Sequence, residues 1–167
     1  AHLIGSIIEI GDTIVREVMV PRPDMVTLAS DFTVAGALAT VVESGYTRLP
    51  VVGNGVDDVL GIVLAKDLIA ADQAGRGGEE SGLAAGLVRD ATFVPETKRV
   101  VELMREMQAS KFHLAVAVDE YGGTAGIVSL EDIIEEVIGE IVDEFDDEVS
   151  LVEQLDDGKL VLAGRLP

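Results

Sequence analysis

GIVLAKDLI at Gly61–Ile69 returns further along the chain as GIVSLEDII at Gly126–Ile134. The similarity extends beyond this motif, and one register without a gap relates residues 27–69 to residues 92–134. A repeat of this length indicates a duplicated module, and copies of one module usually stack on each other. We therefore expect the functional site to lie where the two copies meet.

Each copy carries the hydrophobic pattern of a strand, a helix, two strands and a second helix. Helices are predicted where apolar residues recur at helical spacing, and strands where short apolar runs lie between turn residues. In the first copy the elements are expected at Met25–Leu28, Thr33–Ser44, Leu49–Val52, Val59–Val63 and Leu64–Asp72. In the second copy they are expected at Thr92–Val94, Lys98–Ala109, Leu114–Val118, Thr124–Val128 and Leu130–Ile141. The predicted fold is α+β, with two β-α-β-β-α repeats packed about a pseudo-twofold axis.

The same patterns divide the chain into five segments. An N-terminal helical segment is expected at residues 1–19, followed by the first repeat at residues 20–73. A linker rich in glycine and charge covers residues 74–84, and the second repeat covers residues 85–145. At residues 146–167 two apolar runs flank a DDG turn, which predicts a hairpin that opens a further domain. The missing initiator Met and the end just after this hairpin predict a fragment of a longer protein.

Charge and composition exclude several classes of function. With 31 Asp and Glu against 12 Lys and Arg, the net charge of −19 argues against binding nucleic acid, whose phosphates such a surface repels. The absence of cysteine excludes disulfides and cysteine-ligated zinc. No apolar run approaches the roughly 20 residues that span a bilayer. These properties are typical of a soluble domain.

The acidic residues are unevenly distributed. Fifteen of the 31 lie between Asp119 and Asp157, where there is no Lys or Arg. We favour a solvated helix face, while a surface for cations or for a basic partner is the alternative. The acids around Asp143–Asp147 match no EF-hand spacing, so no metal site is assigned to them.

Ser129 and Asp132 have two interpretations. As S-x-x-D at a strand-to-helix junction they form a capping box, and a carboxylate there also suits the helix dipole. In the functional interpretation the free N–H groups of the helix N-terminus bind phosphate or ribose oxygens, and Asp132 accepts from a ribose diol. Gly126 would permit close backbone approach. A cleft between two copies would favour the second interpretation.

The two copies resemble tandem CBS domains, which share the signature Gly-apolar-x-Thr/Ser-x-x-Asp. The second copy matches it in full, whereas the first has Leu64 where the hydroxyl belongs. The resemblance implies a Bateman module, the regulatory pair that commonly binds adenosine nucleotides. The matching residues are Gly126, Ile127, Ser129 and Asp132 in the second copy and Gly61, Ile62 and Asp67 in the first.

Longer stretches are similar to the CorC/HlyC (haemolysin C-like) group and its relatives, the cyclin M-type magnesium transporters. They are EVMVPRPDMVTL at Glu17–Leu28, DEYGGTAGIVSLEDIIEEVIGEIVDEFDDE at Asp119–Glu148 and LVEQLDDGKLVLAGRLP at Leu151–Pro167. This resemblance implies a preceding transmembrane domain of the same chain, a following transporter-associated domain and a place at the cytoplasmic face of the membrane. It further implies a role in Mg²⁺/Co²⁺ transport or efflux.

The resemblance also assigns a nucleotide site, with ATP or AMP as regulatory ligand, alone or with Mg²⁺. Asp132 would hold the ribose, Ser129 would bond ribose or phosphate, and Arg48 would bind phosphate in a bidentate way. The expected residues, adenine contacts included, are Val20, Met25, Tyr46, Thr47, Arg48, Ile127, Ser129 and Asp132. A second, weaker site is expected at Ile62, Asp67, Lys111, Phe112 and His113. Arg48 as a paired surface charge and His113 as a partly buried strand residue are the plainer interpretations.

Three functions are weighed. The first is a regulatory module that binds an adenosine nucleotide and biases the membrane domain. The alternative is a ligand-free structural module, since such pairs often form homodimers. An enzyme is not expected, because the chain has no cysteine, no P-loop and only two histidines, His2 and His113.

Overall fold

The computed structural model describes residues 11–75 and 84–139, and they form two similar halves. The first half has a three-stranded sheet of order β2-β3-β4 and two helices. Its elements are β2 (Leu28–Ala29), α3 (Val34–Ser44), β3 (Arg48–Val52), β4 (Val59–Leu64) and α4 (Ala65–Gln73). The sheet is mixed, because β2 runs parallel to β3 and β4 antiparallel to it.

The second half has a four-stranded sheet of order β1-β7-β6-β5. Its elements are β5 (Thr92–Pro95), α6 (Val100–Ser110), β6 (Leu114–Val118), β7 (Thr124–Ser129) and a helix at residues 130–139. Three short elements come from the start of the chain: α2 (Val15–Val18), β1 (Val20–Pro21) and the 3-10 turn η1 (Arg22–Asp24). Each half therefore has the predicted β-α-β-β-α order, and the expected α+β fold is confirmed.

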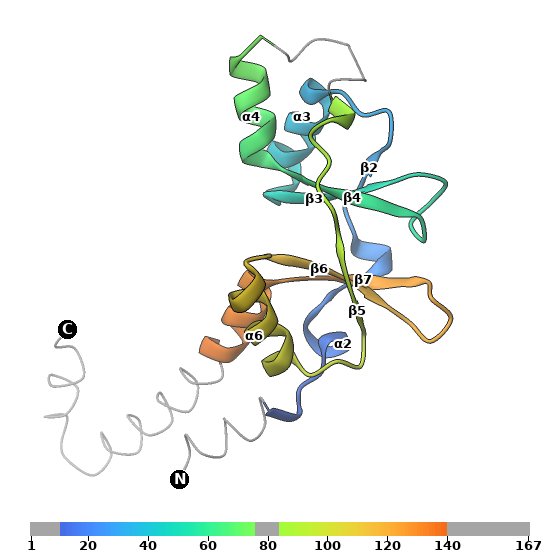
Figure 1. Cartoon of the computed structure of the whole chain (residues 1–167), viewed down its shortest axis with the longest axis vertical. Coiled ribbons are helices and arrows are strands. Elements are labelled where there is room, and N and C mark those ends of the chain that lie inside the picture. Colours follow the sequence, from blue (N-terminus) through green and yellow to red (C-terminus); the bar gives the residue numbers. More distant parts are fainter. Residues whose placement is uncertain (1–10, 76–83, 140–167) are drawn as a thin grey trace, which may run out of the picture.

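The two sheets face each other in the middle of the molecule, with helices outside them (Figure 1). Two of the three hydrophobic clusters lie between a sheet and its own helices. The third joins the sheets, and its buried members are Ile62, Leu114, Val116 and Ile127. The interface between the copies is thus a packed apolar layer.

Local signals explain the helix boundaries. The hydroxyl of Thr33 accepts a hydrogen bond of 3.0 Å from the N–H of Gly36 and caps α3, whose end Gly45 has φ +79°. Both match common rules for helix start and stop. Helix α6 ends on Lys111, the one non-glycine residue with positive φ (+56°) in the described part of the chain.

The segment that precedes each copy in the sequence pairs with the other copy. β1 pairs with β7 of the second half, while Arg89 forms a bridge with Ile62 of the first half. The motif glycines make these crossings possible. A Cβ on Gly126 would overlap the carbonyl oxygen of Val20, and one on Gly61 would overlap that of Arg89. Gly126 therefore admits the protein's own backbone, and not a ligand as the functional interpretation expected.

The gap-free register between the copies is wrong for the first part of each copy. Val51 pairs with Gly61, and Ala117 pairs with Gly126. The separation in the chain between Val51 and Ala117 is one residue longer than the separation between Gly61 and Gly126. The difference arises in the β3–β4 turn, where residues 53–58 fill the space that residues 119–123 fill in the second copy. The first copy therefore has one extra residue in this hairpin.

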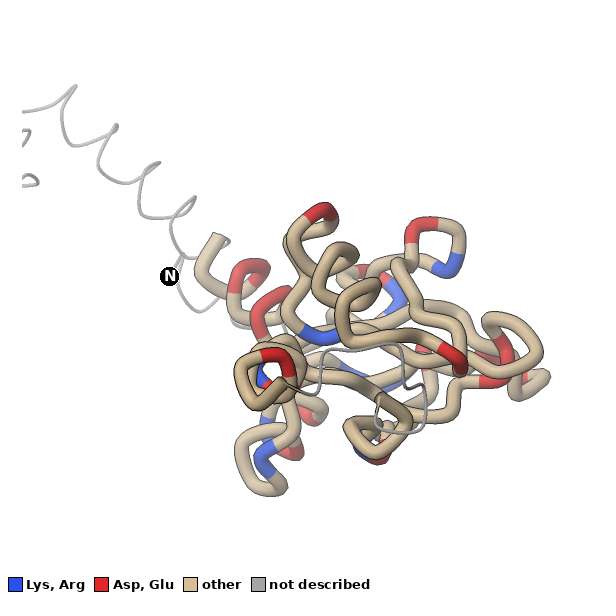
Figure 2. The backbone as a smooth tube through the Cα atoms, turned by 90° about the horizontal axis from the view of Figure 1, so that it is seen from above, with Lys and Arg blue, Asp and Glu red and all other residues tan. Residues whose placement is uncertain are grey.

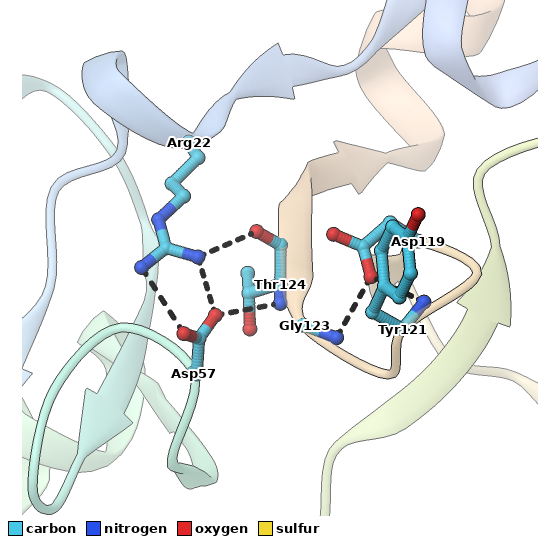
Figure 3. A network of polar contacts seen from close by, with 6 residues as sticks. All are labelled: Arg22, Asp57, Asp119, Tyr121, Gly123 and Thr124. Atoms are coloured by element: carbon cyan, nitrogen blue, oxygen red, sulfur yellow. Dashed lines mark hydrogen bonds and ion pairs between the residues drawn. The ribbon is translucent and has the colours of Figure 1, made fainter.

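This longer turn reaches across to the second copy at the side of the sheets where both hairpins turn (Figures 1 and 3). The Asp57 carboxylate accepts hydrogen bonds from the guanidinium of Arg22 and, at 2.9 Å, from the N–H of Thr124. Arg22 also donates to the Thr124 carbonyl over 3.3 Å. These three residues, here called the hairpin latch, join the two copies.

Several predicted segments lie outside the described residues. They include residues 1–10 of the N-terminal segment, most of the linker, and the acidic end and hairpin at residues 140–167. Among the helices that the structure does describe, none is long and apolar enough to cross a membrane.

Candidate functional site

A cavity of about 220 Å³ lies beside the second-copy motif, at the junction of the two halves. Seven of the eight expected residues line it, and the eighth, Met25, packs against the cluster between the sheets instead. We call it the Asp132 cavity. Its lining consists of Val20, Gly45, Tyr46, Thr47, Arg48, Leu114, Ile127, Ser129, Glu131 and Asp132.

Ser129 and Asp132 form the predicted capping box. The N–H of Asp132 donates to the Ser129 hydroxyl over 3.0 Å, and the N–H of Ser129 donates to Oδ2 of Asp132 over 3.3 Å. Among the described residues no other group donates to Asp132, so its Oδ1 remains available. Oγ of Ser129 acts as the acceptor in its bond to Asp132, so the hydroxyl proton is not used there. Among the described residues no acceptor is bonded to this proton, and it can donate to a ligand. Cap and ligand site are therefore compatible.

Arg48 occupies the wall of this cavity and pairs with two side chains. One of its N–H groups donates to Oε1 of Glu131 over 3.0 Å, and another lies 3.1 Å from Nδ1 of His113. Partial burial of Glu131 raises its pKa, but hydrogen bonding by its own N–H and the charge of Arg48 outweigh burial and hold that pKa below its ordinary value. Glu131 is thus an ion-pair partner and not merely part of a wet helix face.

A second cavity, of about 580 Å³, lies beside the first-copy motif. Four of the five residues expected at the weaker site line it, namely Ile62, Lys111, Phe112 and His113. The fifth, Asp67, is held by Arg89 through bonds of 2.9 and 3.0 Å to its two oxygens. We call this space the Arg89 cavity. The rest of its lining is Thr47, Arg48, Leu64, Ala65, Lys66, Ile69, Arg89, Asp90, Thr92 and Leu114.

The corrected register changes which residues correspond between the two cavities. Once the extra hairpin residue is taken into account, Thr47 corresponds to His113 and Arg48 to Leu114. In agreement, the N–H groups of Ala65 and Leu130 donate to the carbonyls of Thr47 and His113. The gap-free register would match Arg48 with His113, and this match is therefore wrong by one position.

The residues that cross the two motifs give the two motif aspartates different surroundings. Arg89 and Val20 pair with Ile62 and Ile127, which are equivalent positions. The guanidinium of Arg89 donates to both oxygens of Asp67. The aliphatic Val20 cannot donate to Asp132, whose side chain accepts only the helix-cap bond from the residues that the structure describes. Sequence reasoning missed Arg89, because which residue crosses the motif is set by pairing between the copies. It also missed Lys66, which stands within the first motif itself.

The described residues contain no group of three or more His, Asp or Glu that could hold a metal ion. The Asp132 cavity presents the carboxylates of Glu131 and Asp132, three hydroxyl groups and the guanidinium of Arg48 beside the apolar side chains of Val20, Leu114 and Ile127. Such a lining can accept from a diol, donate to an anion and contact a flat ring.

Comparisons with known proteins agree with this geometry. The family model for the CBS domain matches residues 15–74 and 86–139. Two similar curated proteins are the UPF0053 protein Rv2366c of Mycobacterium tuberculosis, 45% identical over 99% of this chain, and the magnesium and cobalt efflux protein CorC of Escherichia coli, 37% identical over 87% of it. The chain spans only 38% and 49% of the length of these two relatives.

Solved structures are similar as well. The CBS domain of a bacterial CNNM/CorC family Mg²⁺ transporter, in complex with ATP, is 40% identical with a TM-score of 0.72, and the match covers 83% of this chain and 96% of that one. A hemolysin-like protein from Oenococcus oeni is 32% identical with a TM-score of 0.72, over 82% and 98% of the two chains. This chain belongs to the CBS domain family and is a CBS-domain pair of the CNNM/CorC group.

Proposed function

We propose that this chain is the adenosine-nucleotide-binding regulatory module of a membrane Mg²⁺/Co²⁺ transport or efflux protein. The observation that carries the proposal is the Asp132 cavity, where Asp132 and Ser129 face Thr47 and Arg48 of the other copy. Asp132 is the proposed ribose acceptor, because its crossing residue Val20 cannot pair with it. Arg48 is the proposed phosphate partner, released from Glu131 when a more highly charged anion arrives.

The chemistry of a relative supports this assignment. The 40%-identical CBS domain was solved in complex with ATP. Because both copies contribute to the cavity, a bound nucleotide would favour one relative arrangement of the halves. A ligand shifts such an equilibrium by its difference in affinity for the two arrangements. We propose that this bias passes to a transmembrane domain of the same protein, with the module at the cytoplasmic face.

Catalysis is not part of the proposal. The cavity has no arrangement of nucleophile and base within the described residues, and Asp132 and Ser129 are bonded to each other's backbone. Arg48 and Thr47 bind and orient in this scheme, and nothing is turned over. ATP and AMP are both candidate ligands, alone or with Mg²⁺.

Thermal unfolding with ATP, ADP and AMP, each with and without Mg²⁺, tests the proposal. A ligand at 100 times its dissociation constant stabilises the folded state by about 2.7 kcal/mol. Asp132→Asn is the informative variant, because its amide oxygen still accepts from the Ser129 N–H while the charge and the second acceptor are lost. It should melt like the wild type without nucleotide and lose most of the ligand shift.

Asp67→Asn is the matched control, since Asp67 occupies the equivalent position and is held by Arg89. Its nucleotide shift should equal that of the wild type. No shift with any nucleotide at millimolar concentration, or equal loss in both variants, would refute the assignment of Asp132.

A second candidate is the ligand-free dimerisation module. The helices after the two motifs both expose isoleucine at equivalent positions, with Ile69 48% and Ile134 40% exposed, and Ile138 is 53% exposed one turn later. A second copy that covers this face would form a homodimer. A dimer whose mass and melting temperature ignore every nucleotide would favour this function.

A further inference from the structure

The Arg89 cavity concentrates positive charge in an acidic chain. Four of the 12 Lys and Arg residues line it, namely Arg48, Lys66, Arg89 and Lys111. Of the 31 acidic residues only Asp90 is found in its described lining. Two of the four are paired within the chain, Arg48 with Glu131 and Arg89 with Asp67. Repulsion among the remaining positive charges is lowered when an anion binds between them. Figure 2 shows the basic and acidic positions along the described backbone.

Two of these cations are uncommitted. Neither Lys66 nor Lys111 forms an ion pair with a residue in 11–75 or 84–139, and both are exposed. Lys111 also has a strained backbone, with φ +56° at the position where the first copy has Gly45. Glycine adopts this conformation without penalty and lysine does not. The second copy therefore has lysine in the lining of this cavity despite a cost to folding.

The cavity does not suit a nucleoside. Asp67, which would accept from a ribose diol, has both oxygens bonded to Arg89, and Leu64 replaces the hydroxyl of the motif. A ribose would have to displace a bidentate ion pair. An anion meets no such obstacle, because Lys66, Arg89 and Lys111 all line the same space.

Arg48 connects this space to the Asp132 cavity, since it lines both. We propose that the Arg89 cavity is a polyphosphate compartment. It takes the outer phosphates of the nucleotide whose ribose lies at Asp132, with Arg48 at the first phosphate and Lys66 and Lys111 at the later ones. The step to a nucleotide rests on the proposed function, whereas the affinity for a polyphosphate group does not.

Calorimetric titration of the wild-type chain with inorganic tripolyphosphate tests the compartment by itself. We expect saturable binding that weakens as salt rises, because exposed charges are screened. Lys66→Gln and Lys111→Gln should each weaken it about five- to tenfold, as one charge-assisted bond is lost. Arg105→Gln removes an exposed charge outside both cavities and should leave it unchanged. Binding of tripolyphosphate that ignores Lys66 and Lys111 would overturn the proposal.

Comparing AMP with ATP tests the nucleotide step. Lys66→Gln and Lys111→Gln should weaken ATP about five- to tenfold and leave AMP unchanged. Lys111→Gly sharpens the test, since it should melt at a higher temperature without ligand and still bind ATP more weakly. If Lys111 had only a structural role, the higher melting temperature of Lys111→Gly would not be accompanied by weaker ATP binding.

The outcomes separate the two proposals. If tripolyphosphate binds through Lys66 and Lys111 but no nucleotide binds, the compartment stands and the nucleotide function fails. If AMP and ATP bind equally well and the lysine variants match the wild type, the nucleotide function stands and the compartment is refuted.

Discussion

Asp67 and Asp132 stand at the same position of the repeated motif, in the first turn of the helix that follows it. They differ in the residue that crosses the motif and in the residue three positions earlier, which is Leu64 in the first copy and Ser129 in the second. Arg89 crosses the first motif and donates two hydrogen bonds to Asp67. Val20 crosses the second, pairs with Ile127 through its backbone and has an aliphatic side chain that cannot donate to Asp132. The side chain on the crossing segment thus determines whether the motif carboxylate has an ion-pair partner on that segment.

Val20→Arg should reproduce the closed state at the second motif. The new guanidinium would reach Asp132 as Arg89 reaches Asp67, so nucleotide affinity should fall at least about tenfold while the melting temperature changes little. Calorimetry with ATP measures the loss. Val20→Leu keeps the apolar wall and serves as the control. Unchanged ATP affinity in Val20→Arg would contradict this account of the two carboxylates.

Gly126→Ala should destabilise the fold. Its Cβ would overlap the Val20 carbonyl oxygen and would lie 2.9 Å from Sδ of Met19, so β1 would have to move off β7. Such a clash costs about 3 kcal/mol of unfolding free energy. Denaturant unfolding measures it. Gly139→Ala, where a Cβ meets nothing within 4 Å, should be neutral or stabilising.

At the scale of elements, the β3–β4 hairpin differs from its counterpart by one residue and uses the difference. Its longer turn carries Asp57 to Arg22 and Thr124, which closes the hairpin latch on the side of the sheets away from the helices that follow the motifs (Figures 1 and 3). In the counterpart turn the aspartate bonds within the turn, since Asp119 accepts hydrogen bonds from the N–H groups of Tyr121 and Gly123.

The latch predicts a pH dependence of stability. Hydrogen bonds from Arg22 and from the Thr124 N–H hold the pKa of Asp57 below its ordinary value of 3.8. A lowered folded-state pKa means that the contribution is complete above 3.8 and is lost as the pH falls from there through the folded value. The melting difference between the wild type and Asp57→Asn should therefore be constant near neutral pH and vanish in strong acid.

Asp58→Asn removes a charge from the same turn but leaves Arg22 and Thr124 untouched, because Asp58 bonds the N–H of Asn54. It separates the latch from a general effect of charge in this acidic chain. A difference for Asp57→Asn that persists unchanged below the folded pKa would show that the carboxylate charge contributes nothing there.

The repeat predicts the elements well and their register poorly. Helix α3 is predicted at Thr33–Ser44 and is found one residue shorter, because an N-cap hydroxyl and a C-terminal glycine are strong local signals. The extra hairpin residue leaves no such signal. LPVV and LAVA are apolar throughout, as buried strands are, so a shift by one residue changes nothing in their pattern. Arg89 escapes prediction for a related reason, since its partner Asp67 is fixed only by pairing between the copies.

On the scale of the whole molecule, the two copies place like faces on like sides. Figure 1 shows α4 and the helix at residues 130–139 on one side of the paired sheets, and both hairpin turns on the other. The helix side exposes Ile69, Ile134 and Ile138. Apolar side chains repeated on one face by internal symmetry favour pairing with a second copy, because a twofold contact buries the same side chains of both chains.

The second candidate function, dimerisation through this face, predicts that Ile134→Asp converts the homodimer to a monomer, since a carboxylate buried without a partner in an apolar interface is strongly unfavourable. Sedimentation over a range of concentrations measures the mass. Tyr121→Asp places the same charge at an 89% exposed side chain on the hairpin side, and this variant should remain dimeric. The monomer should keep the Asp132 cavity, because its described lining comes from one chain, and so retain its shift with ATP. A monomer that no longer binds ATP would mean that the second copy completes the site, and the cavity would then be only half of it.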